Sequence, residues 1–369
     1  MEHTSPTERI DTLVIGGGQT GLTVGYELST RGIDFVILDA SEHIGDAWRK
    51  RWDSLMLFTP ARMNGLPGLA FPAQGTEYVS KDAVADYLEE YAATMDLPVR
   101  SGVRVTRLTR EDGEYLAETS TGTYRAANVI VAMADYQVPF VPDFAPDLDP
   151  NVVQLHSSKY QNPAQLRPGP TLVVGLGNSG ADIALEVSAS HQALVAGTES
   201  GHVPFRLERR FGRWIGVRLV RFTAVKVLNT ATPIGRKARP KMLEKAAPLV
   251  RVKPKDLAAA GVERVPRVTA VTNGLPETAD GRVHDVTNVI WCTGFKPGFS
   301  WIDLPVFDDR GKPVHERGVT DQPGLYFLGL YFLHALWSET ITGVQADARY
   351  VADHLTQRRA QQPVATPAV

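Results

Sequence analysis

Two glycine-rich turns, each preceded by an apolar run and followed by a stretch that can form a helix, constrain this chain more than any other feature. The first is Gly16-Gly17-Gly18-Gln19-Thr20-Gly21, and the second is Gly175-Leu176-Gly177-Asn178-Ser179-Gly180. In this pattern the first glycine permits a tight turn, the second lets the backbone approach a pyrophosphate, and the third lets helix pack on strand. Free N–H groups and the positive end of the helix then hold the phosphates. The sequence therefore predicts two dinucleotide-binding units.

The two turns together imply electron transfer between two cofactors. One G-x-G-x-x-G match is weak evidence because small residues are common in turns, but two matches in the same strand-turn-helix context argue against chance. A chain that binds two dinucleotides usually passes electrons between them, which indicates FAD and a nicotinamide coenzyme. Asp39 ends an apolar strand 23 residues after Gly16, near the spacing at which a carboxylate reaches the ribose hydroxyls. A surface acid at a strand end is the alternative for Asp39.

Composition narrows the class of protein. The chain has 369 residues and a formal net charge of −2, which gives no general attraction to nucleic acid. We expect a cytoplasmic enzyme without an integral membrane segment, because the N-terminal residues are polar and no apolar run reaches the length of a span. Cys292 is the only cysteine, so a redox-active dithiol is excluded. No metal-ligand cluster stands out, and a homo-oligomer is left open.

The order of these segments predicts an α/β protein with two Rossmann-like dinucleotide-binding domains of the three-layer ββα type, the nicotinamide domain being inserted into the FAD domain. Residues 80–95 are predicted as a helix capped by Ser80, and the segments 99–109, 114–119 and 124–131 as β-hairpin strands. The predicted parts are an FAD-binding part at 1–137, an NAD(P)-binding domain at 138–284 that begins with a proline-rich linker, a returning FAD-binding part at 285–355 whose last helix runs from Gly343 to Leu355, and a disordered tail at 356–369.

Residues 202–255 differ from the rest of the second unit and are predicted as a helical basic insertion. They contain 15 Lys or Arg and only two acids. Ile215 and Phe222 share one helix face with Arg218, so the face is not cleanly apolar. Three interpretations stay open: a solvated charged face, a dock for the coenzyme's phosphates or an anionic substrate, and contact with a membrane surface.

Further segments resemble one family. Gly45–Pro60 resembles the segment that follows the FAD ribose acid in class B flavoprotein monooxygenases, which comprise flavin-containing, N-hydroxylating and Baeyer–Villiger enzymes. Cys292–Pro297 resembles their A-T-G-F-R-P hinge between the two dinucleotide domains. Pro323–Gly329 and Gly343–Asp347 resemble their C-terminal FAD contact and last helix. The resemblance covers nearly the whole chain and suggests short bacterial flavin-containing monooxygenases and the plant enzymes that make auxin.

The resemblance also implies the chemistry and the site residues. In this family FAD takes a hydride from NADPH, and the reduced flavin reacts with dioxygen to give a C4a-(hydro)peroxyflavin, which passes one oxygen atom to a soft nucleophile or a carbonyl. The implied catalytic residues are His156, Tyr160 and Arg49, with a structural hinge and a surface ion pair as the alternatives. The implied cofactor contacts are Gly16, Gly18, Gln19, Gly21, Asp39, Trp48, Arg49, Gly175, Gly177, Asn178, Ser179, Gly180, Thr293, Gly294 and Gly329.

The protein's part in such chemistry is to align the cofactors and to keep water from the flavin. Aromatic side chains are the expected walls, with ordinary core packing as the alternative for each of them. The candidates are Trp48, Trp52, Phe58, Tyr331, Phe332 and Trp337.

The sequence departs from the family pattern at several positions. The first hinge, usually A-T-G, is Ala132-Met133-Ala134, so this crossing must avoid the positive φ that glycine allows. Of the signature F-x-G-x-x-x-H-x-x-x-Y/W only His156 and Tyr160 remain. Gly329 is followed by Leu330 and not by Asp, which argues against a carboxylate contact to the flavin ribityl chain.

The end of the strand in the second unit favours NADPH over NADH. An acid at that place would bind the ribose hydroxyls and repel a 2′-phosphate. The strand ends at Ala196-Gly197-Thr198, Glu199 comes slightly later, and basic side chains follow. These basic residues are Arg206, Arg209 and Arg210. NADH stays open as the alternative.

The sequence as a whole predicts an FAD-dependent, NADPH-using monooxygenase that inserts one atom of dioxygen into a small organic substrate, by N- or S-oxygenation or N-hydroxylation. Three alternatives stay open: an NAD(P)H oxidase or reductase without productive oxygenation, a Baeyer–Villiger monooxygenase, and a non-catalytic flavin-binding sensor. No motif identifies the substrate.

Overall fold

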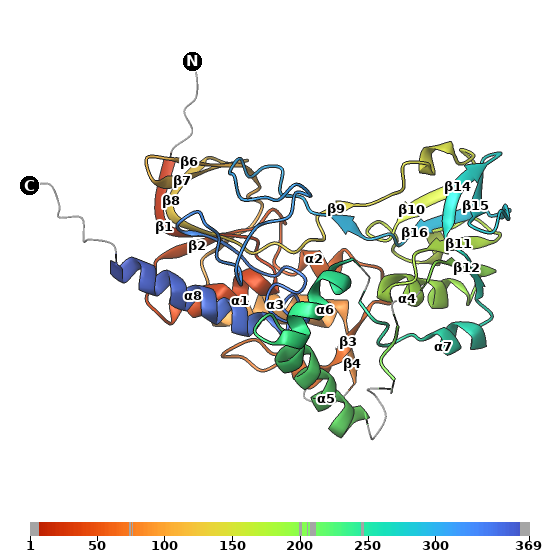
Figure 1. Cartoon of the computed structure of the whole chain (residues 1–369), viewed down its shortest axis with the longest axis horizontal. Helices are drawn as coiled ribbons and strands as arrows, with labels where there is room; N and C mark the ends of the chain where they lie inside the picture. Colours follow the sequence, from red (N-terminus) through yellow and green to blue (C-terminus); the bar gives the residue numbers. More distant parts are fainter. Residues whose placement is uncertain are drawn as a thin grey trace, which may run out of the picture.

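The molecule consists of two lobes joined by a narrow connection (Figure 1). The computed structural model describes residues 7–361 apart from 74, 76, 199–200, 205, 207–211 and 245–246, and apart from the side chains of Arg213, Trp214 and Val217. Four of the sequence predictions lie outside the described residues, namely those for Glu199, Arg209 and Arg210 and for the tail at 362–369.

The first lobe is built on a seven-stranded sheet of order β5-β2-β1-β8-β7-β6, with β18 also paired to β8. β1 runs parallel to β2 and β8, while β6, β7 and β8 form the predicted antiparallel hairpins. Phe35–Leu38 is buried throughout, as expected of an apolar run inside a parallel sheet. The strands are β1 (Thr7–Ile15), β2 (Phe35–Leu38), β5 (Val99–Arg100), β6 (Val105–Glu111), β7 (Glu114–Thr119), β8 (Thr123–Val131) and β18 (Leu325–Phe327).

Helices cover one face of the parallel strands of this sheet, and the antiparallel strands at its far end pack against the other face. Val14 packs in the core beneath the helices, whereas Leu13 packs on the opposite side with Tyr115, as the alternation of side chains along a strand requires. The helices of this layer are α1 (Gln19–Ser29), α3 (Lys81–Thr94) and α8 (Val344–Gln361). Ser80 caps α3 as predicted, accepting the Ala83 N–H at 3.2 Å.

The second lobe contains a five-stranded parallel sheet of order β10-β16-β11-β12-β13. Two sheets with parallel inner strands, each followed at a glycine turn by a helix, confirm the predicted α/β fold with two dinucleotide-binding domains. The elements of this lobe are β10 (Val153–His156), β11 (Thr171–Val174), α4 (Asn178–Val187), β12 (Ala193–Ala196), α7 (Pro254–Ala259), β13 (Glu263–Val265), β14 (Val268–Thr272), β15 (Leu275–Thr278) and β16 (Asn288–Trp291).

The domain boundary predicted between residues 284 and 285 is wrong. β16 pairs in parallel with both β10 and β11, so it is an inner strand of the second sheet. The chain returns to the first lobe only after Trp291, and β18 is the next strand that it adds there. A short apolar strand fits either sheet equally well. The sequence pattern therefore placed the point where the chain returns to the first lobe several residues too early.

The last helix also extends further than predicted. α8 continues to Gln361, so the expectation of a disordered tail is wrong for residues 356–361. These residues are good helix formers, and the first sheet holds two of their side chains. Arg358 donates to the Asn128 side-chain oxygen at 2.6 Å, and Arg359 pairs with Asp11 at 3.1 Å.

The two chain crossings between the lobes pair with each other. The first contains β9 (Val138–Pro139), which lies antiparallel to β17 (Phe295–Lys296) in the second. Phe140 N–H donates to the Gly294 carbonyl at 2.9 Å, and Gly294 has a φ of 84°. Residues 132–134 are not among the described residues with positive φ, which agrees with the absence of glycine there. A short two-stranded ribbon thus joins the lobes.

The basic insertion leaves the second lobe and packs on the first (Figure 1). Leu336 N–H donates to the Leu228 carbonyl at 3.0 Å, and Thr230 N–H donates to the His334 carbonyl at 2.8 Å. The insertion consists of a continuous helical run, η4 (Gly212–Gly216), α5 (Val217–Phe222) and η5 (Thr223–Val227), followed by α6 (Pro233–Leu243). Among the described helices, none has the length and apolar character that crossing a membrane demands.

A loop of the first lobe is anchored in the core of the second. Trp52 is only 4% exposed and packs with Tyr160 and Val173. The neighbouring Asp53 N–H donates to the Gln161 carbonyl at 2.8 Å. The short elements near this loop and along the linkers are α2 (Asp46–Arg49), β3 (Met56–Pro60), η1 (Ala61–Met63), β4 (Tyr78–Ser80), η2 (Ala145–Asp147) and η3 (Pro163–Gln165).

Replacing Trp52 by Ala should destabilise the second lobe by about 3–5 kcal/mol, because the change leaves a large cavity between the lobes. Differential scanning calorimetry should show the loss as a lowered midpoint. Val283→Ala removes an exposed side chain from the same lobe and should leave the midpoint unchanged. Equal midpoints for Trp52→Ala and Val283→Ala would contradict the anchoring role.

Candidate active site

Both glycine turns have the geometry that a dinucleotide requires. Gly16 and Gly175 have φ values of 110° and 108°, in the region that favours glycine. A Cβ on Gly21 would lie 1.8 Å from the Gly16 oxygen, and one on Gly180 would lie 1.8 Å from the Gly175 oxygen. A side chain at either position would therefore force helix and strand apart. Open space faces Gly18, since no atom lies within 4 Å of the place a Cβ would take.

The helices that follow these turns begin without a side-chain cap. Neither α1 nor α4 has a capping side chain or an acid in its first turn, although Ser80 and Thr232 cap other helices of this chain. Uncapped N–H groups at the positive end of a helix are what a pyrophosphate binds. The residues present therefore fit one dinucleotide at each turn.

Asp39 lies where the first unit predicts it, at the carboxyl end of β2. Its Oδ2 accepts the Gly17 N–H at 2.5 Å, and its Oδ1 accepts the Ser41 N–H at 2.7 Å. The backbone of the turn thus fixes the carboxylate beside the predicted phosphate site. This placement fits the predicted contact with an FAD ribose.

Trp48 and Arg49, adjacent in sequence, have different surroundings. The Trp48 Nε1 lies 3.4 Å from the Gln19 Oε1 and so reaches the first glycine turn. The Arg49 guanidinium instead pairs with Glu89 at 2.6 Å and Asp86 at 3.0 Å, both on α3. Arg49 therefore makes the surface ion pairs that were its alternative, and these contacts do not support a catalytic or cofactor role.

His156 ties the end of β10 to the second crossing. Its Nδ1 accepts the Ser158 N–H at 3.1 Å, so the other nitrogen, Nε2, carries the proton and donates to the Gly294 carbonyl at 3.0 Å. The ring is buried, and burial lowers the pKa of His156. His156 is thus a neutral imidazole whose two nitrogens hold the hinge in place.

Tyr160 lies away from the hinge. It is fully buried, and its hydroxyl donates to Glu186 on α4 at 2.8 Å. Burial raises the pKa of Tyr160 above its usual range. The structure does not bring the hydroxyl together with His156, and the core contacts assign Tyr160 a structural role.

Phe295 is the meeting point of four segments at the connection between the lobes. The ring lies 5.0 Å from the His156 ring and 5.8 Å from the Tyr136 ring, both edge-on. The Arg51 guanidinium lies 5.7 Å from the Phe295 ring centre. Thr293, two residues before, donates its hydroxyl to the Phe140 carbonyl of the other crossing. The predicted contacts Thr293 and Gly294 thus belong to the hinge itself.

Gly329 brings the returning segment to the first glycine turn. It lies two residues after the end of β18 and has a φ of 78°, and a Cβ there would lie 2.7 Å from the Thr20 hydroxyl. Residues from both ends of the chain therefore meet at the predicted FAD site.

In the second unit the Asn178 side chain forms hydrogen bonds with the protein's own backbone. Its Nδ2 donates to the Pro248 carbonyl at 3.1 Å, and its Oδ1 accepts the Val250 N–H at 3.0 Å. Ser179 lies half-buried in the first turn of α4. The predicted phosphate donor Arg206 forms an ion pair with Asp256, so that side chain is already engaged.

An acidic cluster beside the hinge has no counterpart among the residues predicted from the sequence. The Tyr136 hydroxyl donates to the Glu339 Oε2 at 2.5 Å. Burial, helped by the nearby Asp135, raises the pKa of Glu339 to about 7, although the Tyr136 hydrogen bond opposes the shift. Burial also raises the pKa of Asp135. Residues 135–136 precede β9 whereas Glu339 precedes α8, so no short-range pattern joins them.

The predicted aromatic walls divide into two groups. Trp52 and Phe332 are core residues, whereas the other four are half-buried: Trp48, Phe58, Tyr331 and Trp337. Trp337 and Val250 both pack against Met63, which joins three segments far apart in sequence. These three side chains form a small apolar cluster.

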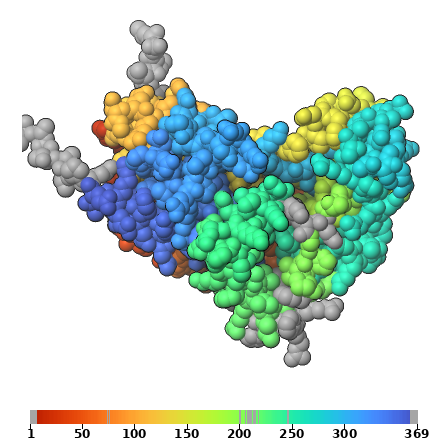
Figure 2. Space-filling view, in the orientation of Figure 1, coloured from red at the N-terminus to blue at the C-terminus, as the bar shows by residue number. Residues whose placement is uncertain are grey.

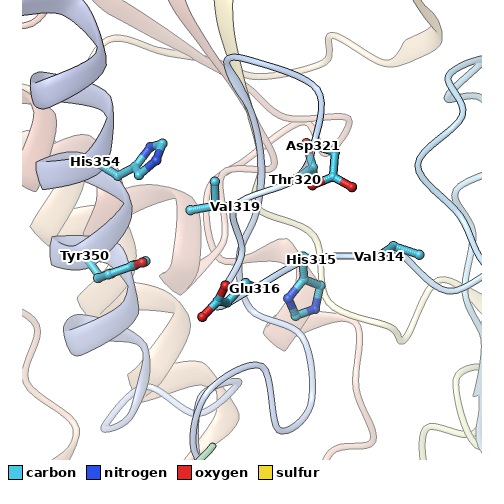
Figure 3. Close-up of a pocket in the computed structure, with 8 residues that line it drawn as sticks. All are labelled: Val314, His315, Glu316, Val319, Thr320, Asp321, Tyr350 and His354. Carbon is cyan, nitrogen blue, oxygen red and sulfur yellow. The ribbon is translucent and has the colours of Figure 1, made fainter. Parts of the chain in front are cut away.

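A pocket of about 410 Å³ lies elsewhere, between the loop 314–321 and α8 (Figure 3). Its walls include His315, Glu316, Tyr350 and His354. None of the glycine-turn residues lines it, so it is separate from both dinucleotide sites. Among the described residues, no group of His, Cys, Asp or Glu could hold a metal ion.

Comparisons with known proteins agree with this geometry. The family described as pyridine nucleotide-disulphide oxidoreductase matches residues 13–209, more than half of the chain. The chain belongs to this family. An uncharacterized CzcO-like oxidoreductase of Geobacillus kaustophilus is 39% identical, with 94% of this chain and 98% of the relative covered. Because Cys292 is the only cysteine, this member lacks the pair of thiols that a redox-active disulfide needs.

Two further similar proteins are described as monooxygenases. The structure of a flavin-containing monooxygenase from Stenotrophomonas maltophilia has a TM-score of 0.75 and 30% identity, with 95% of this chain and 99% of that chain covered. The probable indole-3-pyruvate monooxygenase YUCCA3 of Arabidopsis thaliana is 26% identical, with 94% and 86% covered. The predicted resemblance is therefore confirmed, and the protein is a flavin monooxygenase-like oxidoreductase.

Alanine at the second glycine of each turn should separate the two cofactor sites. Gly18→Ala should fold normally, because φ at this residue is −75° and the space is open, but should bind FAD at least about tenfold more weakly, since the methyl group occupies the place of the pyrophosphate. Gly177→Ala, where φ is −90°, should keep FAD and lose reduction by NADPH. FAD titration and coenzyme-dependent bleaching measure the two effects, and wild-type FAD affinity in Gly18→Ala would refute the first assignment.

Glu339→Gln should reduce the pH dependence of stability. Because the folded-state pKa, about 7, exceeds the unfolded value, the folded protein binds more protons between these values. The stabilising contribution is complete below the unfolded pKa and is lost as pH rises through about 7. Glu339→Gln should thus gain about 1–2 kcal/mol over the wild type at pH 8 and much less at pH 5.

Thermal unfolding from pH 5 to 8 measures this difference. Asp135 acts in the same direction, so the slope should fall without vanishing. Tyr136→Phe keeps the carboxyl and removes a hydrogen bond that opposes the shift, so its slope should be at least as steep as that of the wild type. A Glu339→Gln curve parallel to that of the wild type would show that the carboxyl ionises normally.

Proposed function

We propose that this protein is an FAD-dependent, NADPH-using monooxygenase that inserts one atom of dioxygen into a small organic substrate, at nitrogen or sulfur. The observation that carries the proposal is the pair of uncapped glycine turns on two parallel sheets joined by a hinge. The relatives described as flavin-containing monooxygenases support it. Residues of the first turn, with Asp39 and Gly329, would hold FAD, and those of the second would hold the coenzyme.

The chain's own residues would mainly align the two cofactors and enclose the substrate. When bound, FAD supplies the hydride acceptor and the reaction with dioxygen. Asp39 and the N-terminus of α1 orient the adenosine half of the flavin cofactor, and α4 binds the coenzyme's pyrophosphate. The apolar cluster of Met63, Val250 and Trp337 keeps water from the substrate. None of these roles requires a side chain that transfers a proton.

His156 would serve as a positioning residue in this scheme. Its ring bridges β10 and Gly294, so it fixes the ribbon on which the relative placement of the two dinucleotides depends. The proposal gives it no contact with the reacting atoms.

NADPH is the proposed coenzyme. The strand β12 ends in Ala196, and Gly197 and Thr198 follow, so the two positions directly after it carry no acid that would repel a 2′-phosphate. A cytoplasmic location, where reduced coenzyme is available, completes the proposal.

Anaerobic reduction followed by admission of oxygen in a stopped-flow spectrometer tests the function. We expect NADPH to bleach bound FAD at least about tenfold more efficiently than NADH. Oxygen should then give a transient species that differs in absorbance from oxidised and reduced flavin. With an amine or sulfide substrate, NADPH consumption should match oxygenated product.

The same experiment distinguishes the alternatives. Direct return to oxidised flavin with release of peroxide would indicate an NAD(P)H oxidase, and failure of both coenzymes to bleach FAD would indicate a sensor. Turnover of ketones in preference to amines and sulfides would indicate Baeyer–Villiger oxygenation. His156→Asn should slow the bleaching step while leaving FAD affinity unchanged, as a positioning role requires, and an equal loss of FAD affinity would contradict it.

A further inference from the structure

The helical run 212–227 presents an apolar stripe to solvent. Ile215, Leu219 and Phe222 are 57%, 53% and 58% exposed, and their spacing places them on one face of the helix. Ala224, on the opposite face, is buried, and so is Gly216. At the start of α6, Ile234 is 60% exposed. Half of the eight large hydrophobic side chains that stand out as exposed in the described part of the chain lie in this one stretch.

The same stretch carries a concentrated positive charge. Residues 212–243 contain eight Lys or Arg and no acid, although the chain as a whole has a net charge of −2. The rest of the chain therefore has a net charge of −10. The exposed side chains of Arg218, Arg221 and Lys226 lie on the same run as the apolar stripe.

The insertion that carries the stripe is held against the first lobe. Backbone hydrogen bonds fix the inner side of the insertion to the first lobe, from Leu336 N–H to the Ala224 carbonyl at 3.2 Å and from Thr230 N–H to the His334 carbonyl. Arg239 Nε donates to the Phe332 carbonyl at 2.9 Å. In the space-filling view this insertion is the green part that projects from the lower side of the molecule (Figure 2).

We propose that the insertion docks the protein on an anionic lipid surface, with the run 212–227 lying in the plane of the interface. Exposed Ile, Leu and Phe enter the boundary between headgroups and acyl chains, and the neighbouring cations bind lipid phosphates. The run is a peripheral contact, consistent with the absence of a spanning helix among the described residues.

Other occupants match the surface less well. A symmetric dimer through this face would place eight cations against eight cations, because a two-fold interface brings the same patch together. A nucleic acid or an acidic protein would neutralise the charge but would leave the stripe of Ile215, Leu219 and Phe222 without an apolar partner. A lipid surface satisfies both features at once.

Co-sedimentation of the FAD-loaded protein with vesicles tests this proposal. Binding should be strong with vesicles of phosphatidylcholine containing phosphatidylglycerol, weak with phosphatidylcholine alone, and reduced by salt. The double variant Leu219→Ser, Phe222→Ser should bind at least about tenfold more weakly. Arg218→Gln and Arg221→Gln should each reduce binding about fivefold.

Val314→Ser is the matched control, since Val314 is 51% exposed on the first lobe outside the insertion. It should bind vesicles as the wild type does, and all variants should keep their FAD. Equal binding to charged and uncharged vesicles would overturn the proposal. The proposal would also be overturned if the double variant bound vesicles as the wild type does. A double variant that changed the oligomeric state or nucleic-acid retention, with vesicle binding unchanged, would overturn it as well.

Discussion

The ribbon formed by the two crossings is the contact on which the candidate site depends. Each lobe can build its own glycine turn, but nothing within a single sheet sets how the two turns face each other. Four backbone residues pair across β9 and β17, and Phe295 gathers side chains from four segments around that pair. His156, whose Nδ1 accepts a backbone N–H, adds a hydrogen bond from its other ring nitrogen to the Gly294 carbonyl. The ribbon therefore aligns the two lobes through backbone pairing, ring contacts and this one side-chain hydrogen bond.

The two dinucleotide sites are built mainly from backbone. Their essential features are two left-handed glycines, two helices without caps and close contacts of Gly21 and Gly180 that exclude a Cβ. This explains why the side chains predicted to be catalytic have other partners. Arg49 is held by acids of α3, and Tyr160 is buried against α4. Where a bound cofactor supplies the chemistry, polar side chains near the site are free to form ion pairs and hydrogen bonds that stabilise the fold.

The sequence predicts the parts of this structure that depend on local pattern. Glycine spacing, apolar runs and the Ser80 cap identify both units. The place of Asp39 at the end of β2 follows from its separation from Gly16 along the sequence. The errors come from long-range pairing. Asn288–Trp291 reads as a strand, but only its pairing with β10 and β11 assigns it to the second sheet. The Tyr136–Glu339 hydrogen bond joins residues 203 positions apart, and no periodic signal precedes it. α8 continues past Leu355 because Asn128 and Asp11 hold its last arginines.

The basic insertion contacts both lobes and the apolar cluster. Sequence alone places it in the second unit, yet its hydrogen bonds to 334–336 attach it to the first lobe. It therefore spans the same gap as the ribbon, at a second place, and restrains the relative motion of the lobes. Val250, at its end, contacts the cluster with Met63 and Trp337, so the insertion also contributes to the apolar region proposed for substrate. An outer face in contact with lipid would place that region close to a reservoir of apolar molecules. One segment would then link the position of the protein, the alignment of its lobes and the environment of its substrate.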